Sequence, residues 1–173
     1  MIHDFHKQLE VSISNEKILD PIYNTYFQNI SGISKIERVT SMPRQRAGVD
    51  TIVTLNSGEH IVIQEKIRDR KFTGDFLIEY CSVYKNGMCD KHGWIYTIDS
   101  DYLFTVYKPS NIVIIYPVVQ LKLAWKNNKE RWIQKCNRFS ETCSWHGKYK
   151  TYFSIVPTDD LEFEIKKVMK VSC

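Results

Sequence analysis

The chain has 173 residues, of which 43% are hydrophobic and 25% are charged, and its net charge is +4 at pH 7. This composition predicts one folded domain over residues 1–173 and excludes a low-complexity or disordered chain. No apolar run is long enough to cross a membrane, and the first ten residues carry charges. We therefore expect no membrane association and an intracellular, cytoplasmic protein. The mild positive charge permits an acidic partner such as nucleic acid without requiring one.

Residues 1–48 are predicted to form a helix, a strand and a loop. Asp20 suits the N-cap position before Pro21, and the apolar residues that follow share one helical face. Ser31 and Gly32 end the helix. Residues 33–41 alternate as a strand does, and residues 42–48 form a polar connection with a proline and a glycine.

Residues 49–67 predict a β-hairpin. Two runs rich in β-branched residues flank the corner Asn56-Ser57-Gly58, which is a typical hairpin turn. The pairing that this turn imposes places Asp50 opposite Gln64. Because side chains alternate along a strand, Gln64 and Lys66 point to one face, and Glu65 points to the other.

The rest of the chain predicts alternating helices and strands. Residues 74–87 lie between two glycines and are expected to form a helix with an apolar stripe. Residues 93–98, 101–107, 112–117 and 148–157 are expected to be extended. A long helix is predicted to start at Pro117, and a second over residues 158–170. This order predicts an α/β fold in which helices flank one central mixed sheet.

Asp50, Gln64 and Lys66 bring a carboxylate, an amide and an ammonium group to one end of the hairpin. Burying these groups together is costly unless something binds there. Carboxylate and amide oxygens are suitable ligands for Mg²⁺, which stabilises charge on a phosphate and lowers the pKa of a bound water. A neighbouring lysine can orient or deprotonate that water. The pattern therefore indicates metal-assisted hydrolysis of a phosphodiester.

The stretches "GVD" at 48–50 and "IQEK" at 63–66 resemble the signature of the PD-(D/E)XK nuclease superfamily, which includes restriction enzymes, recombination nucleases and Holliday-junction resolvases. The order of elements over residues 20–116 is also similar. The resemblance implies a restriction-endonuclease-like core with Asp50 as the metal-bridging carboxylate and Lys66 as the catalytic lysine. It also implies that the main-chain carbonyl of Glu65 is a further metal ligand.

Two positions differ from the signature. Val49 stands where proline is common, and Gln64 stands where an acid is expected. Some restriction enzymes are similar in using glutamine there, and a subset supplies the missing acid from the following helix. Glu79, 13 residues after Lys66, lies on that predicted helix near its apolar stripe. The resemblance implies that Glu79 faces the site; the alternative is a solvated helix acid.

Basic residues gather around the hairpin, where residues 35–71 hold eight Lys and Arg against five acids. Individually they are typical of a solvated loop, but together they favour phosphate contacts. The candidates for nucleic-acid binding are Arg44, Arg46, Arg68, Arg70 and Lys71.

The sequence therefore predicts a Mg²⁺-dependent endonuclease that cuts DNA, with Mn²⁺ as an alternative ion. Two-strand cleavage favours a homodimer, and the expected context is phage, mobile-element or restriction-type DNA processing. Gln64 also favours an alternative, a nucleic-acid-binding or structural protein with this fold and no catalysis. A hairpin with a turn-capping aspartate and solvent-facing polar residues is the purely structural alternative.

Five cysteines, an odd number, are scattered along the chain. This pattern favours reduced thiols over a disulfide framework. Cys89 with His92, and Cys143 with His146, each form a Cys-x-x-His pair and could supply a zinc site in an interaction protein. The gap between the pairs is much longer than in compact zinc fingers, so scattered thiols are the favoured interpretation.

Overall fold

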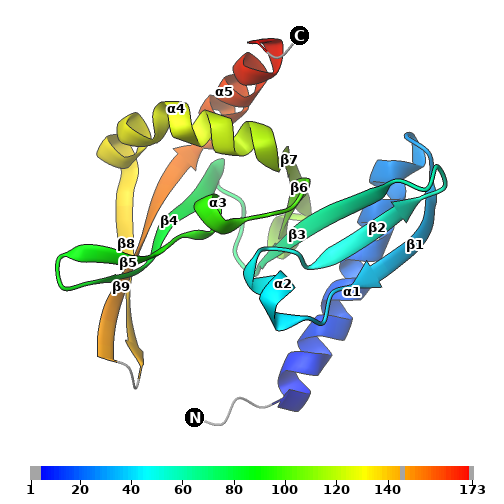
Figure 1. The fold of residues 1–173 in the computed structure, drawn as a ribbon, viewed down its shortest axis with the longest axis horizontal. Coiled ribbons are helices and arrows are strands. Elements are labelled where there is room, and N and C mark those ends of the chain that lie inside the picture. The colour runs from blue at the N-terminus through cyan, green and yellow to red at the C-terminus, as the bar shows by residue number, and fades with distance from the viewer. Residues whose placement is uncertain (1–4, 145–146, 172–173) are drawn as a thin grey trace.

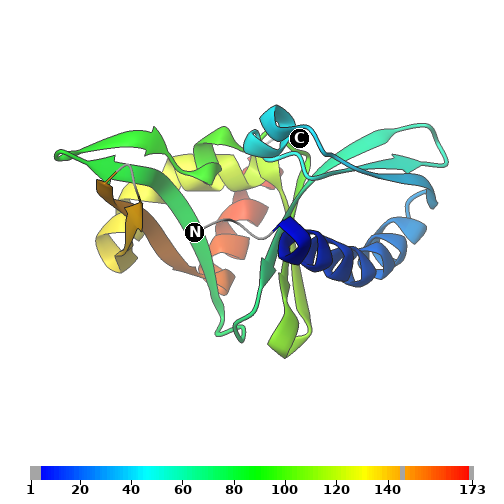
Figure 2. The same cartoon turned by 90° about the horizontal axis from the view of Figure 1, so that it is seen from below.

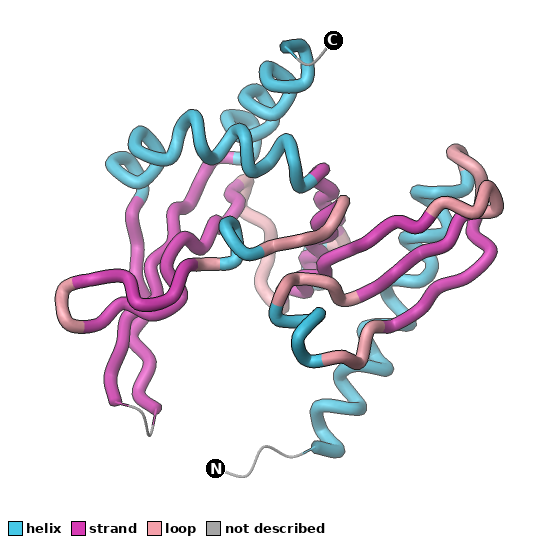
Figure 3. Tube along the Cα trace, in the orientation of Figure 1, coloured by secondary structure: helices cyan, strands magenta, loops and turns pink. Residues whose placement is uncertain are grey.

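The computed structural model describes the backbone of residues 5–144 and 147–171. Within this part of the chain it is a mixed α/β structure with two sheets and five α-helices (Figure 1). The prediction of one central sheet is therefore wrong. Figure 3 shows the strands of the two sheets in separate halves, with α1 running along the first sheet and α4 and α5 along the second.

The first sheet is mixed. Its first three strands pair antiparallel, β3 pairs parallel with β6, and β6 pairs antiparallel with β7. Helix α1 (Phe5–Gln28) packs on one face, where Tyr23, Phe27 and Phe104 belong to one buried cluster (Figure 2). In spatial order the strands are β1 (Ile33–Arg38), β2 (Thr51–Leu55), β3 (His60–Arg68), β6 (Tyr102–Tyr107) and β7 (Ile112–Pro117).

The second sheet is antiparallel and is covered on one face by α4 (Val118–Cys136) and α5 (Thr158–Val171). Trp125 and Trp132 of α4 are fully buried in its core. The same core contains Leu103 and Tyr116 of the first sheet, so the two sheets share buried residues. In spatial order the strands are β5 (Met88–His92), β4 (Asp75–Lys85), β9 (Gly147–Pro157) and β8 (Asn137–Ser144).

Several predicted elements are confirmed. The hairpin, the strands of the first sheet and both C-terminal helices occur where the sequence indicates. The register is also as predicted, because Thr51 pairs with Ile63 and this places the preceding Asp50 opposite Gln64. Local turn chemistry and a period of two are sufficient to fix such a hairpin.

Four predicted elements are wrong. Residues 74–87 contain strand β4 and not a helix, since Phe76 and Ile78 alternate into the core with a period of two. Residues 93–98 contain the short helix α3 (Trp94–Thr97), and the expected loop at 42–48 contains α2 (Met42–Arg46). Pro21 lies inside α1, so Asp20 is not its N-cap.

The prediction that all cysteines are reduced is also wrong. Cys81 of β4 and Cys89 of β5 form a disulfide, and their Cα atoms are 5.9 Å apart. Cys136 and Cys143 are free, while Cys173 lies outside the described residues. Over the described ranges, no helix is both long and apolar enough to span a membrane.

Candidate functional site

The hairpin holds Asp50 against strand β3 through its backbone and its side chain. The Asp50 amide donates to the carbonyl of Ile63 at 2.9 Å, and Asp50 Oδ2 accepts from the amide of Glu65 at 2.8 Å. Gly48, with φ of +77°, lets the chain pass close to Gln64, because a Cβ there would lie 3.1 Å from the Gln64 amide group. The "GVD" stretch therefore brings a carboxylate and an amide side by side.

Lys66 lies on the same face of β3 as Gln64. Its Nζ is 4.9 Å from the centre of the Trp94 ring, in a cation–π contact. Burial, with a smaller effect from Arg68, lowers the pKa of Lys66 to about 8, while the carboxylates of Glu79 and Asp50 oppose this shift. The ammonium group therefore lies within electrostatic range of both predicted acids.

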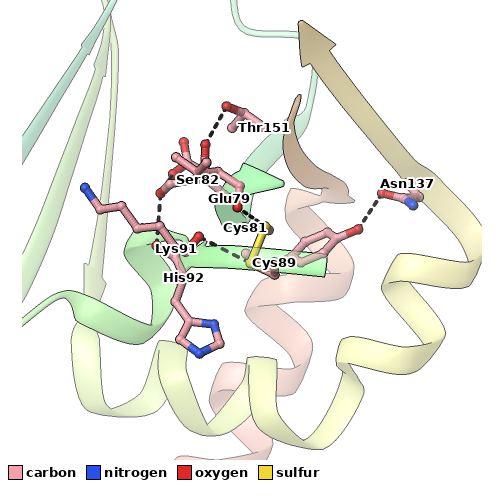
Figure 4. The surroundings of a disulfide bond; sticks show 10 residues. Glu79, Cys81, Ser82, Cys89, Lys91, His92, Asn137 and Thr151 are labelled. Atoms are coloured by element: carbon pink, nitrogen blue, oxygen red, sulfur yellow. Dashed lines mark hydrogen bonds between the residues drawn. A yellow bond between two sulfur atoms is a disulfide. The ribbon is translucent and has the colours of Figure 1, made fainter. Parts of the chain in front are cut away.

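Glu79 comes from β4, not from a helix, so its predicted element is wrong. The strand nevertheless brings its carboxylate close enough to stabilise the charged forms of both Lys66 and Arg68. Glu79 Oε1 accepts a hydrogen bond from Ser82 Oγ, close to the Cys81–Cys89 disulfide (Figure 4). The alternative interpretation of Glu79 as a solvated helix acid is thus wrong about the helix. The charge of Glu79 acts on Lys66.

Two buried oxygens at this site have no hydrogen-bond partner within the described chain. They are Oε1 of Gln64 and Oγ1 of Thr105, the residue of β6 that pairs with Lys66. A buried polar atom without a partner costs free energy, and such atoms are rare unless a ligand or water completes them. Burial also raises the pKa of Asp50. The site is therefore polar and partly buried, and two of its oxygens lack a hydrogen-bond partner among the described residues.

The side chain of Glu65 points to the opposite face of β3, as alternation predicts. There Glu65 Oε1 accepts hydrogen bonds from Tyr23, Arg38 and Thr51. Arg38 is also paired with Asp20 of α1. The Glu65 amide donates to Asp50 on the site face of β3. The network around the Glu65 carboxylate therefore holds the same residue in place from the opposite face of the strand. The sequence did not indicate this network, because the apolar residues after Pro21, Tyr23 among them, predict only one face of a helix.

The five basic candidates differ in position. Arg44 and Arg46 are exposed on α2, and Arg70 and Lys71 are exposed in the connection after β3. Arg68, at the end of β3, is half-buried, and burial lowers its pKa. Of the five, Arg68 is the residue whose charge acts on Lys66.

Trp94 and Thr105 are further residues of the site that the sequence did not indicate. Trp94 begins α3 and covers the Lys66 ammonium, and Thr105 occupies the neighbouring position on β6. Neither residue belongs to a motif. Only the parallel pairing of β3 with β6 and the crossing of α3 over the sheet bring them there.

The residues that could hold a metal are two carboxylates and one amide, Asp50, Glu79 and Gln64. Within the described ranges, no group of three or more His, Cys, Asp or Glu residues is arranged to hold an ion. The disulfide removes Cys89 from the zinc set that the two Cys-x-x-His pairs suggested, and His146 of that set lies outside the described residues.

Comparison with protein-family models, curated proteins and solved structures finds no match for this chain. No family is therefore shown by similarity.

Proposed function

We propose that this protein is a Mg²⁺-dependent deoxyribonuclease that hydrolyses phosphodiester bonds of DNA, with Mn²⁺ as an alternative ion. The observation that carries the proposal is the hairpin face that holds Asp50, Gln64 and Lys66, where the Gln64 oxygen Oε1 is buried without a hydrogen-bond partner among the described residues and the charge of Glu79 acts on Lys66. An ordinary hairpin would gain nothing from this combination. A hard divalent cation would be bound by these oxygen atoms.

A restriction-endonuclease-like core is part of the proposal. The mixed first sheet, with α1 on one face and the hairpin followed by a parallel strand, supports it. The difference is that β4 and β5 occupy the place of the expected helix. Glu79 would then supply from a strand the acid that Gln64 lacks.

The donor set fits a hard divalent ion. Asp50 and Gln64 would hold it through a carboxylate and an amide oxygen, with the Glu65 carbonyl and Glu79 as further ligands. When bound, Mg²⁺ stabilises negative charge on the phosphate and acidifies a water. The absence of a second acid at position 64 leaves less negative charge and predicts weaker ion binding than an all-carboxylate site would give.

The chain's own groups have separable roles in this proposal. Lys66, held over Trp94, positions the attacking water and offsets negative charge on the phosphate. The Glu65 amide orients the Asp50 carboxylate. Arg68 contacts a phosphate beside the cut, and the exposed Arg70, Lys71, Arg44 and Arg46 extend the basic surface.

Nicking of supercoiled plasmid DNA in Mg²⁺ tests the proposal. Asp50→Asn and Lys66→Met are expected to lower the rate about a hundredfold or more. Asp90→Asn and Lys126→Met change exposed residues of the same types on β5 and α4, and both should cut as wild type does. Equal cutting by Asp50→Asn and wild type, with both folded, would contradict the proposal.

A binding protein without catalysis is the second candidate, and Gln64 is the observation that favours it. This candidate predicts that the wild type retards DNA in a gel but never cuts it in Mg²⁺ or Mn²⁺. A homodimer is proposed for cleavage of both strands, and sedimentation of the DNA complex measures its stoichiometry. A role in phage, mobile-element or restriction-type processing follows from fold analogy alone.

A further inference from the structure

A tyrosine-rich pocket of about 390 Å³ lies on the second sheet, next to the candidate site. Its size is within the range of small-ligand sites in proteins. We call it the tyrosine pocket and define it by Tyr80, Tyr84, Tyr96, Tyr152, His92 and the Cys81–Cys89 disulfide.

The rings of the tyrosine pocket are held by neighbouring aromatic residues. Tyr80 stacks on Trp125 with an interplanar angle of 25°, and its hydroxyl donates to Asn137 at 2.8 Å. Tyr84 meets Tyr152 edge to face, with ring centres 4.9 Å apart. Fixed aromatic walls of this kind bind a flat ligand at a low cost in conformational entropy.

Some of the pocket's aromatic and polar surface is available to a ligand. Tyr96 is 42% exposed, although the ring is large and apolar. Within the described chain, the hydroxyls of Tyr84, Tyr96 and Tyr152 form no hydrogen bond. The pocket therefore offers ring faces for stacking together with groups that can hydrogen-bond the edge of a ligand.

Basic residues adjoin the tyrosine pocket. Tyr84 is shared with a neighbouring pocket of about 240 Å³, whose lining includes Lys85, Lys148 and Lys150. Among the described residues, Lys148 forms no ion pair, while Lys85 and Lys150 are paired with acids. An aromatic pocket beside a lysine-lined pocket is complementary to a base and its adjoining phosphates.

The tyrosine pocket shares an element with the candidate site. Helix α3 carries Trp94, which contacts Lys66, and also Tyr96, which lines the pocket. Gly93, before α3, lies so close to β4 that a Cβ there would be 2.2 Å from the Glu79 carbonyl oxygen. Glu79 and Tyr80 are consecutive on β4, so their side chains diverge toward the site and toward the pocket.

We propose that the tyrosine pocket binds an unpaired nucleobase of the DNA strand. The inference rests on the proposed function and narrows it, because it names as substrate a strand with a single-stranded or extruded nucleotide near the cut. Stacking on Tyr96 and Tyr152 would hold the base, and Lys148 would contact a phosphate. A base inside a regular duplex cannot enter such a pocket without leaving its stack.

The test is fluorescence anisotropy of labelled oligo-dT of about twelve nucleotides, measured with the full chain in Ca²⁺. Tyr96→Ala is expected to weaken binding of this single strand about tenfold or more. Tyr96→Phe keeps the ring and should bind within about twofold of wild type. Phe163→Ala, which removes a ring that is 63% exposed on α5, is the matched control and should leave binding unchanged.

Three results would overturn the inference. The first is single-strand binding by Tyr96→Ala that equals wild type. The second is that Tyr96→Ala loses as much affinity for a blunt duplex of the same length as for the single strand, which would indicate a general phosphate contact. The third is that Tyr96→Ala changes the protein from dimer to monomer in sedimentation while its DNA binding stays unchanged. This result would identify the pocket as a contact between two copies of the chain.

The same variants separate this inference from the proposed function. If Asp50→Asn abolishes plasmid nicking while Tyr96→Ala binds single strands normally, the hydrolase proposal stands and the pocket proposal fails. If Tyr96 governs single-strand binding but wild type never cuts DNA in Mg²⁺ or Mn²⁺, the pocket proposal stands and the hydrolase proposal fails.

Discussion

Replacement of Lys66 by methionine is expected to stabilise the metal-free protein at neutral pH. Burial lowers the pKa of Lys66 from 10.5 to about 8. At about 1.36 kcal/mol per pKa unit, the folded state disfavours the ammonium by about 3 kcal/mol relative to the unfolded chain. Partial exposure to solvent lowers the expected gain to about 2 kcal/mol. Methionine keeps an unbranched apolar chain beside Trp94 and removes the charge.

The stabilising effect of Lys66→Met has a defined pH dependence. Because the pKa of Lys66 is lower in the folded state, the unfolded chain binds more protons between about pH 8 and pH 10.5. The free energy of unfolding of the wild type therefore rises with pH in that window, compared with that of Lys66→Met. Below about pH 8 both states are protonated and the full penalty is present. The advantage of the variant is thus largest near neutrality and disappears in alkali.

Urea unfolding followed by circular dichroism in EDTA, at about pH 7 and about pH 9.5, measures this difference. Lys126→Met removes an exposed lysine of α4 and should show no such pH dependence. A Lys66→Met variant that is less stable than wild type at neutral pH would refute the reasoning. It would mean that attraction to Asp50 and Glu79 exceeds the cost of burying the ammonium.

Three further predictions concern the groups around the site. Gln64→Glu adds a carboxylate beside Asp50 and should tighten Mn²⁺ binding in calorimetry about five- to tenfold, since one added charge contributes on the order of 1 kcal/mol. Unchanged Mn²⁺ affinity would contradict the proposal that residue 64 is a ligand of the ion. Arg38→Met leaves the Glu65 carboxylate buried without its cation and should lower the free energy of unfolding by about 3 kcal/mol in urea; no loss would contradict the network behind β3. Cys81→Ser removes the disulfide and should lower the free energy of unfolding by about 2.5 kcal/mol. Dithiothreitol should then destabilise the wild type but not the variant. An equal loss of stability in both proteins on adding dithiothreitol would contradict the Cys81–Cys89 bond.

The hairpin was predictable because its determinants are local. The Asn56-Ser57-Gly58 corner fixes the pairing, and the pairing places Asp50 opposite Gln64. Alternation along β3 then separates Lys66 from Glu65, and the structure has the two side chains on opposite faces. Each step uses residues close in sequence, so nothing about the rest of the fold was needed.

Strand β4 was mispredicted because its apolar residues fit two periods. Phe76, Tyr80 and Tyr84 recur at helical spacing, but Phe76, Ile78 and Tyr80 also alternate. The pairing of β4 with β9, which is far along the chain, decides between the two patterns. The charge of Glu79 still acts on Lys66, because a strand as well as a helix can bring a carboxylate within electrostatic range of the lysine.

The remaining features depend on contacts between distant segments. The network of Tyr23 and Arg38 with Glu65 joins α1, β1 and β3, and each member alone is an ordinary residue of its element. The Cys81–Cys89 disulfide requires β4 and β5 to be adjacent strands, whereas the sequence indicated a helix there. The tyrosine pocket forms for the same reason, from β4, β5, α3 and β9 together.

We propose above that Asp50, Gln64 and Glu79 bind one divalent ion beside Lys66. The most direct measurement is Mn²⁺ binding, followed by the paramagnetic resonance signal of the free ion as the protein is titrated. We expect one ion per chain for wild type and for Asp90→Asn, and binding at least about tenfold weaker for Asp50→Asn and Glu79→Gln. Binding by Asp50→Asn as tight as that of wild type would contradict it.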